Sequence, residues 1–172
     1  MRRQMLVTAL GGLALAACRP ATMTRQEIAV QEQALQGRVQ GWAKAFSNRQ
    51  RDSLATYYDT TGSLTMAWPD GDRRNGWGEE SAKQDEFFGM ARQVNLVLHD
   101  AQVEVLSPTA AVVTFRHAMD VIVGEVQPER RYFNGQGTMV WTRAGGASPW
   151  VIHRGQVSET PQPPAPAPAR RR

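Results

Sequence analysis

Three stretches in the second half of the chain place polar side chains two or four positions apart, which in a β-strand puts them on one face. These side chains are Arg116 and Asp120 in the first stretch, Tyr132 and Gln136 in the second, and Arg154 and Gln156 in the third. Guanidinium and amide groups orient carboxylate and carbonyl oxygens. If these faces point inward, they predict a polar pocket for a small ligand carrying such a group, with Trp42 and Trp68 as its apolar walls.

The sequence does not fix which face points inward, because both faces of the first stretch carry apolar residues. The opposite face of that stretch holds Val113, Phe115, His117 and Met119. If this face points inward, His117 becomes the pocket residue. Arg116 and Asp120 then have a second interpretation, as an ordinary ion pair on a solvated or dimer-forming face.

Three side chains could take part in acid–base chemistry, namely Asp120, Tyr132 and His117. His117 with Asp120 could act as a general base and its orienting carboxylate. However, residues three apart on a strand project from opposite faces, so direct contact would need a bulge. His99, His117 and His153 lie on separate expected strands without ligand spacing, so we expect no metal site. No Gly-rich phosphate loop and no G-x-S-x-G motif occurs, and we expect no cofactor.

Four strands are expected to position these side chains. The stretch Gln136–Ser158 indicates two of them, Tyr132–Arg143 and Trp150–Ser158, joined by the turn-forming run Ala144–Pro149. Two further strands, at about Val94–Leu106 and Ala110–Val123, are separated by Ser107-Pro108-Thr109. Connected in order, the four strands predict a meander. Trp141 and Trp150 are expected in its core.

Helices are expected to precede the meander. Thr24 and Glu27 form a capping box, and the helix that follows ends near Ser47-Asn48. Its apolar residues recur at helical spacing: Ile28, Leu35, Val39, Trp42 and Phe46. The remaining expected elements are a helix over Asp52–Tyr58, a strand over Ser63–Trp68, a turn at Pro69–Asp72, and a third helix from a second capping box at Ser81–Gln84 to about Gln93. This order predicts an α+β fold with three N-terminal helices packed on a curved, mostly antiparallel sheet.

The formal charge of +4 is concentrated at the two ends of the 172-residue chain. Without Arg2, Arg3 and the three closing arginines, 15 basic residues stand against 16 acidic ones. A nearly neutral domain argues against nucleic-acid binding, which usually needs a basic face. One cysteine, Cys18, excludes a disulfide framework.

The first 18 residues, MRRQMLVTALGGLALAAC, have the pattern of an export signal. Arg2 and Arg3 precede the apolar stretch Met5–Ala17, which is too short to span a bilayer as a helix. Leu15-Ala16-Ala17-Cys18 resembles the bacterial lipobox, which implies lipidation of Cys18. The alternative is a cleaved signal with an incidental cysteine. Residue 19, which follows the lipobox cysteine, is Arg rather than Asp. By resemblance to lipoprotein sorting in Gram-negative bacteria, this implies an anchor in the outer membrane, with the domain facing the periplasm.

Residues 19–27 are interpreted as a tether, residues 28–160 as one domain, and residues 161–172 as a Pro/Arg tail. The tail reads PQPPAPAPARRR, a composition that excludes a packed element. It predicts either a disordered tail or an electrostatic contact with anionic envelope polymers or lipid head groups.

The order of elements and three short motifs resemble the nuclear-transport-factor-2-like superfamily. The motifs are Gly137-Thr138-x-Val140-Trp141, then Trp150-x-Ile152, then Gln156-x-Ser158. The resemblance implies the cone-shaped, cystatin-like α+β fold of ketosteroid isomerase, the polyketide cyclase SnoaL and the association domain of calmodulin-dependent kinase. Many members have His-x-Ser at the last motif, so Gln156 departs from the pattern. Members often dimerise across the open sheet, which would use Phe115, Met139 and Trp141 if their face points outward.

Steroid-isomerase chemistry is excluded residue by residue. That chemistry needs a carboxylate base and a tyrosine that polarises the carbonyl. The resemblance places the base near Trp68-Pro69 and the tyrosine near Trp42, so neither group is present.

The sequence therefore predicts a lipid-anchored envelope protein whose cone domain binds a small ligand or self-associates as a homodimer. One alternative is a SnoaL-like lyase, cyclase or hydratase acting on a small carbonyl or carboxylate substrate. Another is an envelope adaptor acting through its outer sheet face and tail.

Overall fold

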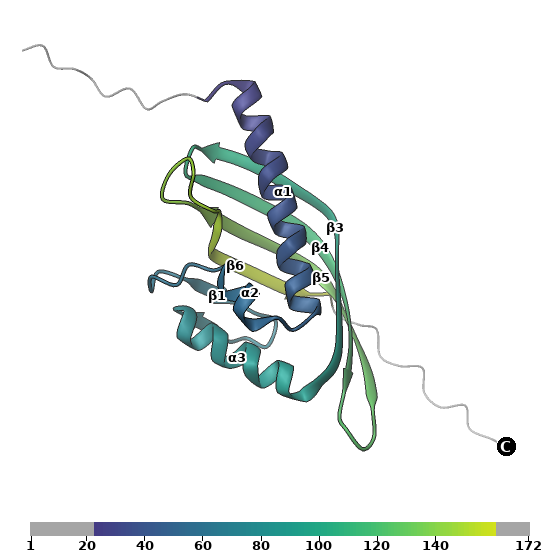
Figure 1. Cartoon of the computed structure of the whole chain (residues 1–172). Helices are drawn as coiled ribbons and strands as arrows, with labels where there is room; N and C mark the ends of the chain where they lie inside the picture. The colour runs from purple at the N-terminus through teal and green to yellow at the C-terminus, as the bar shows by residue number, and fades with distance from the viewer. Residues whose placement is uncertain (1–22, 161–172) are drawn as a thin grey trace, which may run out of the picture.

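A computed structural model describes residues 23–160, which form three helices and one six-stranded sheet (Figure 1). The helices are α1 (Arg25–Ser47), α2 (Arg51–Ala55) and α3 (Trp77–Met90). The strands are β1 (Thr65–Ala67), β2 (Arg73–Asn75), β3 (Ala91–Ser107), β4 (Ala110–Val123), β5 (Glu129–Thr142) and β6 (Val151–Glu159). The leader with Cys18 and the Pro/Arg tail lie outside the described residues. None of the helices in residues 23–160 is long and apolar enough to cross a membrane.

Helix α1 confirms the predicted capping box and both of its ends. The Glu27 amide donates to Thr24 Oγ1 over 3.2 Å, and the Thr24 amide donates to Glu27 Oε2 over 2.7 Å. The apolar side of α1 is buried from Leu35 to Phe46. It packs along β3, on the concave face of the sheet (Figure 1). Burial of this face drives α1 onto the sheet, because the hydrophobic effect scales with the apolar area removed from water.

The sheet has the strand order β2-β1-β6-β5-β4-β3. The predicted meander of β3 to β6 is confirmed, since each strand pairs antiparallel with the next. Strand β1 adds to β6 in parallel, and β1 and β2 form an antiparallel hairpin. The turn at Pro69–Asp72 thus leads into a strand, β2, that the sequence analysis did not predict. Register shifts in β3 and between β5 and β6 give the sheet the irregularities that accompany strand bending.

Helix α3 corrects the prediction of a capping box at Ser81. The helix begins at Trp77, and the Ser81 hydroxyl donates to the carbonyl of Gly78 inside it. Its N-cap is Gly76, whose φ of 84° lies in the region that glycine adopts without strain. The helix ends at Met90, so the segment up to Gln93 belongs to β3.

Only α1 lies along the long strands, whereas α2 and α3 close the end of the sheet near β1 and β2 (Figure 1). The predicted packing of all three helices on one sheet face is therefore only partly correct. Helix α2 ends earlier than the predicted Asp52–Tyr58, because the chain turns after Ala55 and Tyr58 forms a β-bridge with Ile152 of β6. The fold class itself, a mixed α+β fold with a curved sheet, is confirmed.

The structure decides which sheet face points inward. On β4 the residues Val113, Phe115 and His117 are buried, while Thr114 and Arg116 are exposed. Across the ladder, Phe115 pairs with Gly137, and Val113 pairs with Met139. Phe115, Met139 and Trp141 are therefore core residues, and they are not available for contact with a second copy. The expectation that Trp141 and Trp150 lie in the core is confirmed.

Candidate functional site

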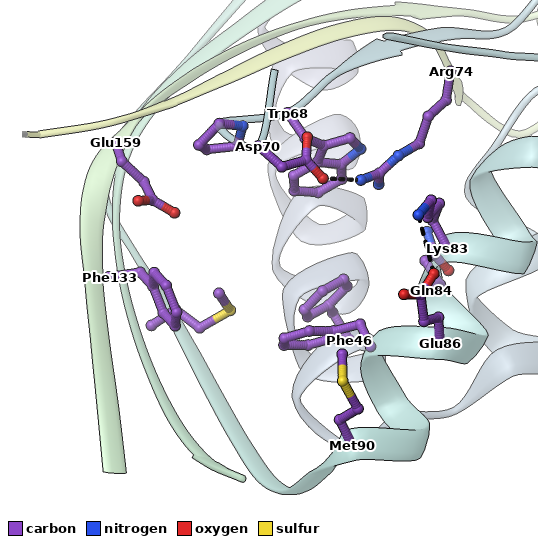
Figure 2. Close-up of a pocket in the computed structure, with 13 residues that line it drawn as sticks. Phe46, Trp68, Asp70, Arg74, Lys83, Gln84, Glu86, Met90, Phe133 and Glu159 are labelled. Atoms are coloured by element: carbon purple, nitrogen blue, oxygen red, sulfur yellow. Dashed lines mark hydrogen bonds and ion pairs between the residues drawn. The ribbon is translucent and has the colours of Figure 1, made fainter. Parts of the chain in front are cut away.

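The cone is hollow at the end where α3 faces the sheet. A cavity of about 280 Å³ opens there between the C-terminal end of α1, the helix α3, the β1–β2 hairpin and the strands β4 to β6 (Figure 2). The apolar side chains that line it are Phe46, Trp68, Pro69, Phe87, Met90, Met119 and Phe133. The polar ones are Asp70, Arg74, Lys83, Gln84, Glu86 and Glu159. A mainly apolar cavity with a few polar groups is the usual form of a small-molecule site.

A second, smaller cavity of about 70 Å³ lies next to the first and shares five of its lining residues. Its remaining walls are Trp42, Leu96, Phe115, His117 and Val157, all from α1 and the sheet. The two cavities are adjacent, and His117 is the one ionisable side chain that lines the inner cavity but not the outer one.

His117 is buried on the inward face of β4, with 7% of its surface exposed. Its ring packs edge-on against Phe115, with 6.4 Å between the ring centroids. Its Nδ1 atom is buried and has no hydrogen-bond partner among residues 23–160. Burial lowers the pKa of the imidazole, because a charged ring would lose its hydration. The ring is therefore neutral at pH 7 and can donate one hydrogen bond and accept another.

A buried polar network stands behind the cavity wall. Glu80 is completely buried, and it accepts hydrogen bonds from Trp68 Nε1 over 2.9 Å and from Gln84 Nε2 over 2.7 Å. Arg74 lies 3.5 Å from the same carboxylate. This network fixes the indole of Trp68, which lines both cavities. The sequence analysis did not find Glu80, because one glutamate on a helix gives no signal of its burial.

The second wall tryptophan is held in the same manner. Trp42 Nε1 donates to the hydroxyl of Tyr58 over 2.9 Å, and both side chains are buried. Burial, together with the nearby charge of Glu80, raises the pKa of Tyr58 well above its usual value. The phenol therefore stays neutral across the physiological range and acts as a fixed hydrogen-bonding group.

The charged groups at the cavity rim are mostly paired. Arg74 contacts Asp70 over 2.5 Å, and Lys83 contacts Glu86 over 3.0 Å. Glu159 forms no ion pair or hydrogen bond with another side chain in residues 23–160. Figure 2 shows its carboxylate directed into the cavity from the sheet side.

The polar set predicted to line the pocket lies on the outer face of the sheet instead. Arg116 is 71% exposed and binds Asp100 rather than Asp120, and Asp120 lies 3.2 Å from Arg130. Tyr132 is exposed beneath the Arg130 guanidinium. The reason is the phase of the strands, since His117 and its neighbours occupy the inward face. The expected ion pair of Arg116 with Asp120 is therefore not formed.

Some of the predicted residues are still brought together, but on the outside. Arg116, Gln136 and Gln156 line a polar depression on the outer sheet face, and Arg154 is exposed on the same strand as Gln156. Of the eight predicted ligand-binding residues, Trp42 and Trp68 lie at the interior cavity. His117 does so as well, which is the outcome expected if the other sheet face points inward. His117 and Asp120 project from opposite faces, so they do not form a base and its orienting group.

The cavity also contains residues that the sequence analysis did not single out. Phe133 and Met119 share the inward face with His117, and Phe46 and Phe87 reach the cavity from α1 and α3. The sequence pattern placed Met119 on the same strand face as His117, but Met119 was not among the predicted site residues. Within residues 23–160, no group of three or more His, Cys, Asp or Glu side chains is placed to hold a metal ion.

Comparison with solved structures shows the fold. A nuclear-transport-factor-2-like superfamily protein from Salmonella enterica serovar Typhimurium superimposes with a TM-score of 0.69 and 14% identity, over 83% of this chain and 96% of that one. A proposed scytalone dehydratase from Novosphingobium aromaticivorans superimposes with a TM-score of 0.68 and 12% identity, over 84% of this chain and 96% of that one. The association domain of calmodulin-dependent kinase II from C. elegans superimposes with a TM-score of 0.61 and 19% identity, over 78% of this chain and 99% of that one.

These likenesses show the nuclear-transport-factor-2-like fold, as the sequence motifs predicted. No protein-family profile matches the sequence. No curated protein matches it either. The function of this chain must therefore be argued from its own cavity, since this fold carries many activities.

Proposed function

We propose that this domain binds a small, mainly apolar molecule inside the cone. The observation that carries the proposal is the pair of adjacent cavities, about 280 and 70 Å³, lined by aromatic and methionine side chains. The inner cavity adds one buried imidazole whose Nδ1 lacks a partner in the described residues. Buried polar atoms are normally hydrogen-bonded, so a ligand group that bonds to His117 would satisfy it.

Filling the cavity tests the proposal. Met119 lies on the inward face of β4 and lines both cavities. Met119→Trp should occupy the ligand volume and raise the Kd of any cavity ligand about tenfold or more. Ala118→Trp is the matched control, because Ala118 is the next residue on the strand and faces outward. The measurement is tryptophan fluorescence during ligand titration, since Trp42 and Trp68 form part of the walls.

Thermal melting of both variants checks that they fold. Met90→Trp offers a second blocking variant at the exposed rim of the cavity, where overpacking costs little. If both blocking variants bind as well as the unmodified chain, the ligand does not occupy the cavity and the proposal is wrong.

A lyase or dehydratase is the second function that a specific observation favours. A neutral, buried imidazole that lines a cavity is a suitable general base. In the dehydration of a β-hydroxy carbonyl compound, His117 would take the proton next to the carbonyl. The carbon–oxygen bond of the hydroxyl would then break, and the departing hydroxide would take the proton held by His117 and leave as water. The ultraviolet absorbance of the resulting conjugated carbonyl measures this conversion, and its absence for every bound β-hydroxy ligand would exclude the activity.

We also propose that a lipid on Cys18 carries this domain on the outer membrane of the cell envelope. The support is the Leu15-Ala16-Ala17-Cys18 motif after an apolar stretch with two arginines before it. Several acyl chains anchor a protein stably, because each buried methylene contributes about 0.8 kcal/mol. Cys18→Ser should move the protein from the membrane fraction to the soluble fraction and abolish labelling by an alkyne fatty acid. Retention of Cys18→Ser in the membrane fraction would contradict the anchor.

A further inference from the structure

We propose that the cavity selects ligands that carry an amine cation on an apolar body, and that Glu159 binds this amine. The inference rests on the proposed function, because it requires that the cavity holds a small molecule. It adds the chemical class of that molecule and the residue that recognises it. Three observations support it: the pairing of the rim charges, the aromatic walls, and the row of residues on the sheet.

The charges around the cavity leave one negative group without a counter-charge. Arg74 is held between Asp70 at 2.5 Å and Glu80 at 3.5 Å. Lys83 is held by Glu86 at 3.0 Å and lies 3.9 Å from Asp72. Both cations of the lining are therefore neutralised by carboxylates.

Glu159 differs from the other rim charges. In the part of the chain that the structure covers, no cationic side chain pairs with it. Its carboxylate points into the cavity, opposite the paired groups of the β1–β2 hairpin and α3 (Figure 2). A ligand that supplied the missing positive charge would form a charge-assisted hydrogen bond there.

The aromatic walls favour the same kind of ligand. Phe46, Trp68, Phe87 and Phe133 all line the outer cavity together with Glu159. Aromatic faces attract a nearby cation through the ring quadrupole, and the attraction is strongest where water is excluded. A carboxylate among aromatic rings therefore favours an ammonium group over a hydroxyl or a carboxylate on the same apolar body.

The strand register places His117 and Glu159 in one row of the sheet, and the imidazole reaches over the glycine between them, since a Cβ atom added there would lie 2.8 Å from His117 Cε1. Gly135 on β5 pairs with His117 on one side and with Glu159 on the other. The three residues thus form one row on the inward face, in which the middle position carries no side chain. Since neighbouring strands lie about 4.8 Å apart, the outer two Cα atoms are roughly 10 Å apart. A neutral imidazole at one end of the row does not repel a cation, and it can accept a hydrogen bond from it.

The test compares three ligands that share one apolar body: phenylbutylamine, phenylbutanol and phenylbutyrate. The full chain is titrated with each at neutral pH, and tryptophan fluorescence reports binding. We expect the amine to bind about fivefold more tightly than the alcohol, and phenylbutyrate to bind most weakly. Glu159→Gln should abolish the preference for the amine and leave the affinity for the alcohol unchanged. Glu104→Gln, which removes an exposed carboxylate from β3, should keep the preference.

The outcomes separate the inference from the proposed function. Equal binding of amine and alcohol, with no effect of Glu159→Gln on their ratio, would overturn amine selection and leave cavity binding in place. Tighter binding of phenylbutyrate than of phenylbutylamine would overturn it as well. Failure of all three ligands to bind the unmodified chain would contradict both the inference and the proposed function.

Discussion

Replacing Glu80 by alanine is expected to lower the free energy of unfolding by about 3–5 kcal/mol, the range for breaking a buried ion pair by removing one partner. The carboxylate is completely buried and accepts from Trp68 and Gln84, with Arg74 3.5 Å away. Its removal leaves one buried and one partly buried donor without an acceptor, and one guanidinium without its inner counter-charge. Urea unfolding followed by circular dichroism measures the change, and the midpoint should shift without a change of slope.

Two further variants make this prediction specific. Glu86→Ala removes an exposed carboxylate whose one ion pair within residues 23–160 is with Lys83, and this change should lower the free energy of unfolding by less than about 1 kcal/mol. Glu80→Gln keeps an oxygen that can accept a hydrogen bond from Trp68. Its loss in the free energy of unfolding should therefore lie between the losses for Glu80→Ala and Glu86→Ala. A loss for Glu80→Ala no larger than that for Glu86→Ala would show that the network contributes little to stability.

Replacing Gly135 by alanine is expected to destabilise the domain by about 3 kcal/mol, at the upper end of the usual cost of overpacking. An added Cβ atom would lie 1.8 Å from the carbonyl oxygen of Ser158 and 2.8 Å from Cε1 of His117. The first contact is with backbone, so β5 and β6 would have to separate locally. Thermal melting of the variant, compared with the unmodified chain, measures the loss.

The matched control is Gly37→Ala in α1. Apart from its chain neighbours and the backbone of its own helix, no atom of residues 23–160 lies within 4 Å of a Cβ added there. Alanine is favoured over glycine in a helix by up to about 1 kcal/mol, so this variant should melt at the same or a higher temperature. If Gly135→Ala melts at the same temperature as Gly37→Ala, the close approach of β6 to β5 does not constrain the fold.

Much of the fold could be predicted because its signals are local. The Thr24–Glu27 capping box and the apolar spacing that follows specify α1, since a helix start and its buried face depend on residues three or four positions apart. The limits of β4 were predicted to the residue, because alternation ends at the turn residues on either side. The N-cap of helix α3 was placed five residues late, at Ser81 in place of Gly76, because a glycine N-cap gives no side-chain signal. Strand β2 has three residues, too few for alternation to indicate it.

The candidate site could be predicted only in part, because its position depends on which sheet face meets the helices. Arg116 and His117 are neighbours in sequence, and each face of their strand carries apolar residues, so either assignment satisfied the pattern. A shift of one residue exchanges the two faces completely. Glu80, which is buried, and Glu159, which is exposed at the cavity rim, are likewise indistinguishable in sequence from the other glutamates of the chain.

The sequence by itself determined the fold class, the order of the elements in the meander, the limits of α1 and the core positions of Trp141 and Trp150. Each of these follows from periodicity and turn chemistry that act over a few residues. Only the tertiary structure decided that His117 faces the cavity and Arg116 faces outward, that Glu80 is buried between Trp68 and Arg74, and that Glu159 enters the cavity without a counter-charge. These features come from contacts between segments far apart in the chain, where packing and strand register, rather than local pattern, determine which side chains meet.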